Sequence, residues 1–175
     1  RDDKLRLFEL HPTDGNILTE NFSDAGRRAQ VTLADGFAGL KSVLPPPPRR
    51  ALVLIDPPYE LKEDYQQVVQ TLKKAMQKWP TAIYALWYPI LGKQADRSRT
   101  LLEQCKYAGW PSVLVAELEV AAQPEEWGMN GSGMLILNAP WQLDSQLAAL
   151  LPRLCDKLAQ GDGAQWRLEW LAKPE

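Results

Sequence analysis

The sequence is poor in the side chains that most often bind metal ions. Its 175 residues contain one histidine, His11, and two cysteines, Cys105 and Cys155, which lack metal-ligand spacing. We therefore expect no metal site and interpret the cysteines as reduced, buried thiols of a cytoplasmic protein. No apolar run approaches the ~20 residues of a membrane span, and no segment resembles a signal peptide, so we expect no membrane contact.

The sequence also has little net charge. There are 20 Lys and Arg residues against 22 Asp and Glu residues, which gives a formal charge of -2. No global positive field therefore draws the chain toward nucleic acid. Any contact with phosphate must come from local basic groups, of which Arg27–Arg28, Arg49–Arg50 and Lys73–Lys74 are candidates.

The order of apolar patterns predicts one α/β domain, with a mostly parallel sheet and antiparallel C-terminal strands. The predicted strands are residues 4–10, 29–34, 51–55, 83–87, 113–120, 133–138 and 165–171. The predicted helices are residues 12–23, 36–43, 62–78, 96–108 and 143–158. Four prolines at 45–48 predict a stiff connection between the second helix and the third strand.

The segment 51–59, with the sequence ALVLIDPPY, carries the chemistry. Residues 51–55 have the length and β-branched content of a strand buried on both faces, and two successive prolines end it. Residues 56–59 are therefore expected at the carboxyl end of a sheet strand. Open α/β folds bind their ligands at that edge, so this motif is the first candidate for a functional site.

The residue types of this motif predict its substrate. The Asp56 carboxylate is an acceptor at neutral pH, and the Pro57 carbonyl, stiffened by Pro58, is a second acceptor held beside it. Two such acceptors suit an exocyclic amine, because they take its two hydrogens and leave the lone pair aimed at an electrophile. Tyr59 supplies a flat face for an aromatic ring, a contact worth roughly 1–3 kcal/mol. The motif predicts a nucleobase amine, swung out of its stack.

Residues 56–59 resemble motif IV of the S-adenosylmethionine-dependent amino-methyltransferases, which act on adenine N6, cytosine N4 or guanine N2. Five blocks in order and spacing, one of which contains this motif, extend the resemblance to the RlmJ family of 23S ribosomal RNA adenine-N6 methyltransferases. The blocks are FELHP at 8–12, ADGF at 34–37, LIDPPYE at 54–60, YALWYP at 84–89, and GM at 128–129 with SGM at 132–134. The resemblance implies a Rossmann-like methyltransferase fold, S-adenosyl-L-methionine as cofactor and an adenine of 23S ribosomal RNA as substrate.

Acids after two earlier strands complete the expected cofactor site. In a Rossmann-like sheet, the carboxylate ending the second strand accepts from ribose hydroxyls, and Glu9 fits that role. The resemblance implies that Asp35 accepts from the amine of the cofactor's adenine, that Gly36 allows close backbone approach and that Asp56 joins this set. Glu9 or Asp35 alone would be interpreted as a solvated acid or helix cap. Together with Asp56, they favour a binding site.

The resemblance places two other segments near the substrate. Trp87–Pro89 is expected to end the strand at 83–87 and to line the adenine pocket, with core packing as the alternative. Residues 128–133, which include Asn130 and Ser132, are expected to form a flexible polar loop near the target base. An ordinary hairpin turn is the alternative for this loop.

One expected element of the cofactor site is missing. In this superfamily a glycine-rich turn after the first strand holds the methionine part of the cofactor, and no G-x-G-like turn follows a predicted strand here. The chain also begins at Arg1. We therefore interpret residues 1–175 as the C-terminal part of a single class I methyltransferase domain, truncated before that turn. We expect this part alone to bind S-adenosylmethionine weakly or not at all.

Two other functions stay open. Related enzymes with D-P-P and an aromatic residue methylate guanine N2, and a non-catalytic RNA-binding or assembly domain can share the fold. The intact motif at 56–59 argues against loss of catalysis. We expect a monomer whose partner is 23S ribosomal RNA.

Overall fold

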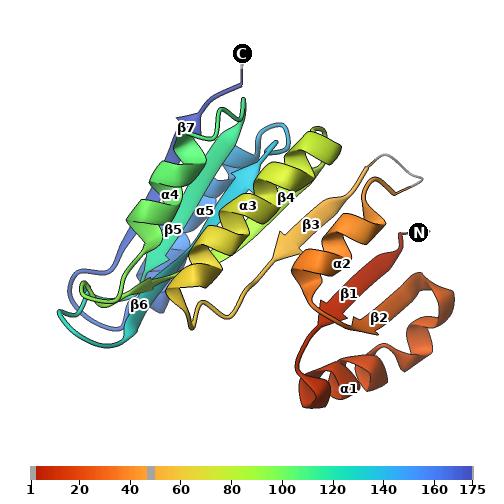
Figure 1. Cartoon of the computed structure of the whole chain (residues 1–175). Helices are drawn as coiled ribbons and strands as arrows, with labels where there is room; N and C mark the ends of the chain where they lie inside the picture. Colours follow the sequence, from red (N-terminus) through yellow and green to blue (C-terminus); the bar gives the residue numbers. More distant parts are fainter. Residues whose placement is uncertain (1–2, 47–49, 175) are drawn as a thin grey trace. The chain divides into compact units, whose positions relative to one another are not determined.

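The structure is a computed structural model that describes residues 3–46 and 50–174 (Figure 1). It divides into two compact units, residues 1–46 and 47–175, and each is described by itself. The division falls in the predicted proline connection, of which residues 47–49, including the candidate phosphate contact Arg49, lie outside the described residues. In the described part of the chain, no helix combines the length and the apolar character needed to cross a membrane.

The first unit is built on two parallel strands, paired from Leu5–Ala29 to Glu9–Leu33. Its elements are β1 (Leu5–Glu9), α1 (Pro12–Asn21), the 3-10 helix η1 (Ser23–Arg28), β2 (Ala29–Leu33) and α2 (Gly36–Val43). A parallel pair needs a crossover connection, and α1 supplies it. Both strands therefore end at the same edge, where the Ala34 N–H donates to the Glu9 carbonyl at 3.0 Å.

The second unit contains a five-stranded sheet in the order β3-β4-β6-β5-β7. Its elements are β3 (Leu52–Ile55), α3 (Lys62–Lys78), β4 (Ile83–Leu91), α4 (Ser98–Lys106), β5 (Val113–Glu119), β6 (Met129–Leu137), α5 (Leu143–Leu158) and β7 (Gln165–Ala172). β3 and β4 are parallel, β6 is antiparallel to β4 and β5, and β7 is antiparallel to β5. The carboxyl ends of β3, β4 and β5 therefore share one edge of the sheet. This pattern confirms the predicted α/β class with antiparallel C-terminal strands.

Helices cover both faces of this sheet (Figure 1). α3 and α4 pack side by side over one face, and α5 packs against β5 and β7 on the other. α3 buries a stripe of apolar residues that recur at helical spacing, which is the pattern that predicts it. These residues are Tyr65, Val68, Val69, Leu72 and Met76. β5 is buried along most of its length, so the core lies on both sides of the sheet's central strands.

A charged cluster is buried in the sheet on the face that α4 covers. Glu117 on β5 is 1% exposed and accepts from the Tyr88 hydroxyl at 2.9 Å. Arg167 Nη1 donates to the same carboxylate at 3.0 Å, and Arg99 Nη1 on α4 lies 3.3 Å away. Gly133 makes room for this arrangement, because a Cβ there would lie 2.2 Å from the Tyr88 ring. The carboxylate is therefore buried with partners on three neighbouring elements.

The prediction that residues 51–55 are buried on both faces is wrong. β3 is an edge strand of its sheet, and Leu52 and Leu54 are 65% and 66% exposed. Ile55 is the buried residue of the strand. A short apolar run is typical of a central strand, but periodicity alone does not separate a central strand from an edge strand.

β4 extends beyond the predicted end at Trp87–Pro89 and continues to Leu91. The Ile83 N–H donates to the Ala51 carbonyl at 3.2 Å, so odd-numbered residues of β4 turn their backbone groups toward β3. β3 ends opposite Leu86, so the backbone nitrogen of residue 89 points past the end of β3, where there is no partner strand. A proline is tolerated there because it removes no ladder hydrogen bond.

β6 begins at Met129, so most of the predicted loop at 128–133 is a strand. Asn130 is 5% exposed, and its Nδ2 donates to Glu119 Oε2 at 2.7 Å. Ser132 pairs with Leu118 of β5. Glycines in this stretch weaken the strand pattern of the sequence, which explains the error. The connection between β5 and β6 is residues 120–128.

Candidate functional site

The edge where β3, β4 and β5 end gathers three connections of the second unit. These are residues 56–61 after β3, residues 92–97 after β4 and residues 120–128 after β5. The sheet topology brings them to one edge although they are far apart in the sequence. The predicted catalytic motif therefore lies where parallel strands end, as ligand sites in open α/β sheets do.

Asp56 is exposed, whereas the next residue, Pro57, is buried. Pro58 is again exposed and Tyr59 is buried. This alternation anchors the segment through positions 57 and 59 and leaves the Asp56 carboxylate available to a ligand. After Tyr59 the chain enters α3, where the Leu61 N–H donates to Asp64 Oδ2 at 2.9 Å. The motif is therefore tied to a strand at one end and to a capped helix at the other.

The Tyr59 side chain is turned into the unit. It is 7% exposed, and its hydroxyl donates to the Trp87 carbonyl of β4 at 2.8 Å. Its ring centroid lies 4.5 Å from that of Tyr65 on α3 and 6.3 Å from that of Trp87. Burial raises the pKa of the Tyr59 hydroxyl, and Tyr65 raises it further, so the group stays a donor at neutral pH. The flat face predicted for base stacking is not open in this conformation.

The backbone of Tyr59 has a φ of 54°, in the left-handed region. Residues other than glycine rarely adopt such a φ, and a strained conformation of this kind costs on the order of 1–3 kcal/mol. It persists only where surrounding contacts determine it. The contacts of Tyr59 with Tyr65 and Trp87 provide that constraint.

The predicted cofactor residues Glu9 and Asp35 lie together at the edge of the first unit where β1 and β2 end. Glu9 Oε1 accepts from the His11 N–H at 2.8 Å. Asp35 Oδ1 accepts from the Phe37 N–H at 2.9 Å and caps α2. Asp35 thus has the capping role that its position before Gly36 also predicts.

These residues fit the polar groups of a nucleoside. Each local hydrogen bond uses one oxygen of its carboxylate, and the second oxygen can accept from a ribose hydroxyl or a purine amine. Gly36 is exposed, and a Cβ there would approach Phe8 no closer than 3.6 Å. Packing within the chain therefore does not require a glycine at this position, and the backbone there is open to close approach by a ligand. The fourth predicted cofactor residue, Asp56, belongs to the second unit.

The connection at 120–128 is held to the connection after β4 by backbone hydrogen bonds. The Gly92 N–H donates to the Gly128 carbonyl at 2.8 Å, and the Lys93 N–H donates to the Pro124 carbonyl at 2.9 Å. Lys93 Nζ also pairs with Glu125. This fixed connection presents Trp127, which is 84% exposed. The backbone on either side is tied down, so the exposed indole offers an aromatic face at the edge that carries Asp56.

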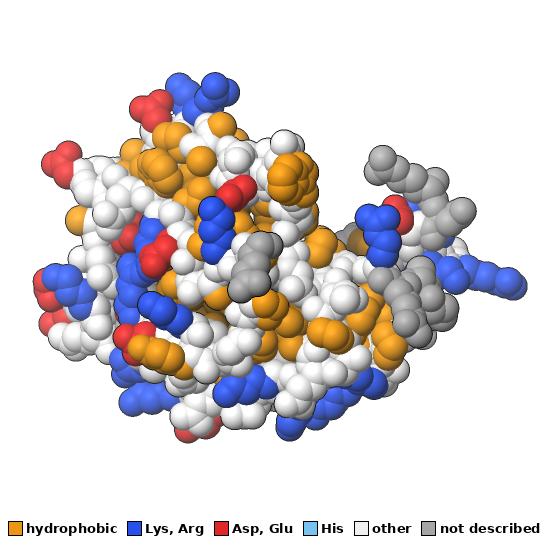
Figure 2. All heavy atoms as spheres, turned by 90° about the horizontal axis from the view of Figure 1, so that it is seen from above, with side chains coloured by type: hydrophobic (Ala, Val, Ile, Leu, Met, Phe, Trp, Pro, Cys, Tyr) orange, Lys and Arg blue, Asp and Glu red, His pale blue; other side chains and the backbone are white. Residues whose placement is uncertain are grey.

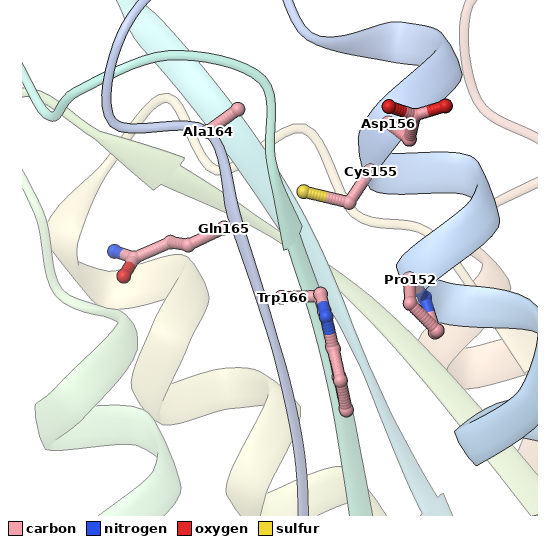
Figure 3. Close-up of a pocket in the computed structure, with 6 residues that line it drawn as sticks. All are labelled: Pro152, Cys155, Asp156, Ala164, Gln165 and Trp166. Carbon is pink, nitrogen blue, oxygen red and sulfur yellow. The ribbon is translucent and has the colours of Figure 1, made fainter.

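A pocket of about 420 Å³ lies between α5 and β7 of the second unit, and β7 is at the other end of the strand order from β3, which leads into the motif at 56–59 (Figure 3). Cys155 and Asp156 line it from α5, and the side chain of Gln165 points away from that helix. Within the residues that the structure describes, no group of three His, Cys, Asp or Glu side chains could hold a metal ion.

Sequence reasoning missed how Tyr59 is held and the exposure of Trp127. Tyr65 is recognisable in the sequence only as part of the apolar stripe of α3, because its contact with Tyr59 depends on tertiary packing. The exposure of Trp127 could have been predicted from the sequence, because Trp127 is a lone aromatic residue between two acids and a glycine. A large apolar side chain in a polar connection is a candidate for binding.

Comparisons with known proteins identify the family. The family model described as "Ribosomal RNA large subunit methyltransferase D, RlmJ" matches residues 1–172. Proteins named ribosomal RNA large subunit methyltransferase J, from Haemophilus influenzae and Escherichia coli, are 39% and 40% identical over 169 residues, or 97% of this chain. The chain spans 59% of the length of each of these relatives.

Solved structures agree on the fold. A crystal structure from Legionella pneumophila is 32% identical, with a TM-score of 0.85, and the match covers 97% of this chain and 61% of that one. A structure from Clostridium thermocellum, 14% identical with a TM-score of 0.51, covers 77% of this chain and 74% of that one and shares the fold alone. The predicted Rossmann-like methyltransferase fold is confirmed. The chain belongs to the RlmJ family of ribosomal RNA large subunit methyltransferases.

Proposed function

We propose that this chain is the part of an S-adenosylmethionine-dependent methyltransferase that presents the target amine, and that the amine is N6 of an adenine in 23S ribosomal RNA. The observation that carries the proposal is the exposed Asp56 carboxylate on a proline-stiffened motif where β3 ends. Family membership supports the reaction class. Residues 1–175 form the C-terminal part of one methyltransferase domain in this proposal, and the enzyme acts in the cytoplasm as a monomer.

Asp56 and the Pro57 carbonyl are the proposed acceptors for the two hydrogens of the amine. This orients the nitrogen lone pair, and the carboxylate stabilises positive charge that develops on nitrogen. When bound, S-adenosylmethionine would supply the methyl group from its cationic sulfur and leave as a neutral thioether, and the methylated amine would lose one proton. Glu9, Asp35, Gly36 and Asp56 are the proposed cofactor contacts. Alignment of two reactants can supply roughly 7–11 kcal/mol of a reaction barrier.

The proposed contact with RNA is local. Figure 2 shows Lys and Arg side chains in separate groups, with Asp and Glu side chains among them. The formal charge of -2 agrees with this mixture. Trp127 is the aromatic face that we propose for an unpaired base beside the target, because stacking needs no positive field.

Methyl transfer to protein-free 23S RNA from cells that lack the modification tests the proposal. The complete gene product that carries this chain is incubated with labelled S-adenosylmethionine, and the nucleosides are analysed by mass spectrometry. We expect N6-methyladenosine, and we expect Asp56→Ala to lower the rate by at least about 100-fold, the scale for losing a key polar group in a reaction site.

Asp156→Ala is the matched control for Asp56→Ala. Asp156 is an exposed aspartate on α5, 77% exposed, and its nearest cation lies 3.9 Å away. We expect its loss to leave the rate unchanged. Label in N2-methylguanosine would overturn the adenine assignment. No label in any nucleoside, with cofactor binding shown by calorimetry, would favour a binding domain without catalysis.

A further inference from the structure

We infer that the Tyr59 hydroxyl is a positioning group for Asp56: it makes the hydrogen bond to β4 that Pro57 cannot make, and it thereby fixes the turn that presents the carboxylate. The inference rests on the proposed function, which assigns Asp56 its role as acceptor. It gives Tyr59 a task besides the flat face predicted from the sequence.

The register of β3 and β4 identifies the missing hydrogen bond. Ile55 lies opposite Leu86, and the Ile83 N–H donates to the Ala51 carbonyl, so the odd-numbered residues of each strand turn their backbone N–H and carbonyl groups toward the other strand. If β3 continued, the N–H of residue 57 would donate to the Trp87 carbonyl. Residue 57 is a proline and has no N–H. The Tyr59 hydroxyl donates to that same carbonyl at 2.8 Å.

The conformation of Tyr59 is adapted to this bond. Its φ of 54° turns the chain so that the side chain points back to β4, between Tyr65 and Trp87. With 7% of the residue exposed, water does not compete freely for the Trp87 carbonyl. A phenyl ring without the hydroxyl would keep both ring contacts and lose the donor.

Asp56 depends on this anchor because it lies between two fixed points. The first is Ile55, which is paired in the sheet, and the second is Tyr59. The Asp56 side chain is exposed, so its position follows from the backbone on either side. Without the hydroxyl, the ring contacts of Tyr59 and the burial of Pro57 still hold the segment 56–60 in place, but its hydrogen bond to β4 is lost and the carboxylate can shift. A displacement of about 1 Å at a reacting group can lower a rate by about 100-fold.

The test compares Tyr59→Phe with Tyr84→Phe in the complete gene product. Tyr84 is a matched control, because its hydroxyl is buried and donates to the carbonyls of Ala75 and Trp79 at 3.1 and 3.0 Å, at the other end of β4. We expect Tyr59→Phe to lower kcat about 10- to 100-fold with KM for RNA within about twofold, and Tyr84→Phe to leave both unchanged. A Tyr59→Phe enzyme with the kcat of the wild type would overturn the inference.

Hydrogen exchange separates failure of this inference from failure of the proposed function. We expect the backbone amides of residue 56 and residues 59–64 to exchange at least about 10-fold faster in Tyr59→Phe than in Tyr84→Phe, whether or not the protein methylates RNA. Equal protection in the two variants would show that the hydroxyl does not hold the turn. If the wild type transfers no methyl group but amide exchange is faster in Tyr59→Phe as expected, the role of the Tyr59 hydroxyl in holding the turn is supported and the proposed reaction is wrong.

Discussion

Replacement of Arg167 by Met tests whether the buried carboxylate of Glu117 depends on its cations. Glu117 is 1% exposed and has three partners: Arg167 Nη1 at 3.0 Å, the Tyr88 hydroxyl at 2.9 Å and Arg99 Nη1 at 3.3 Å. The Arg99 side chain is 58% exposed, so solvent screens its contribution, whereas that of Arg167 is 33% exposed. Arg167 is therefore the main counter-ion of the buried charge.

The expected loss of stability follows from the contacts that Glu117 keeps after Arg167→Met. Breaking a buried ion pair by removal of one partner costs about 3–5 kcal/mol, because a charge is left without compensation. Tyr88 and Arg99 still contact Glu117, which places Arg167→Met at the low end, about 3 kcal/mol. For a chain of this size, 1 kcal/mol shifts Tm by about 2–4 °C, so the expected decrease is about 6–12 °C.

Thermal unfolding followed by circular dichroism measures this shift. Arg153→Met is the control: it removes an exposed arginine from α5, and we expect a change within about 0.5 kcal/mol. In a Glu117→Gln background the buried charge is gone, and Arg167→Met should then cost less than about 1 kcal/mol. An equal cost in both backgrounds would refute the reasoning, because the loss would then come from packing of the arginine stem or from its pair with Glu169, and not from the buried charge of Glu117.

Two further substitutions test packing and RNA contact. Gly133→Ala places a Cβ 2.2 Å from the Tyr88 ring and should destabilise the protein by about 1–3 kcal/mol in urea denaturation, whereas Gly161→Ala, at a position with open space, should leave the midpoint unchanged. Trp127→Ala should raise KM for RNA at least about fivefold with kcat unchanged. Trp141, 88% exposed at the opposite edge of the sheet, provides the control, and an equal effect of Trp141→Ala would contradict a specific contact at Trp127.

Local patterns in the sequence predict most of the helices and strands. The helix predicted at 62–78 matches α3, because its apolar stripe is long and regular. The helix predicted at 96–108 corresponds to α4, and Gly109 follows it with a φ of 76°, as a helix stop does. These features depend on residues close in the sequence, and pattern reasoning suffices for them.

Features that depend on tertiary neighbours could not be predicted in the same way. The exposure of Leu54 follows from the place of β3 at the edge of its sheet, and the continuation of β4 through Pro89 follows from where β3 stops. The motif at 56–59 is recognisable in the sequence, but the inward turn of Tyr59 depends on a carbonyl 28 residues away. The roles assigned to Glu9, Asp35, Gly36 and Asp56 stay predictions.

The backbone hydrogen bonds that join residues 92–94 to the connection at 120–128 have an evolutionary consequence. The Gly92, Lys93 and Gln94 N–H groups hold that connection through the carbonyls of Gly128, Pro124 and Glu125. Bonds of this kind do not depend on which side chains the connection carries. Mutations at positions 125–127 can therefore change what this edge recognises without moving its frame. The backbone geometry of this edge is thus held independently of the side chains that the edge presents, so those side chains can be exchanged while the geometry stays.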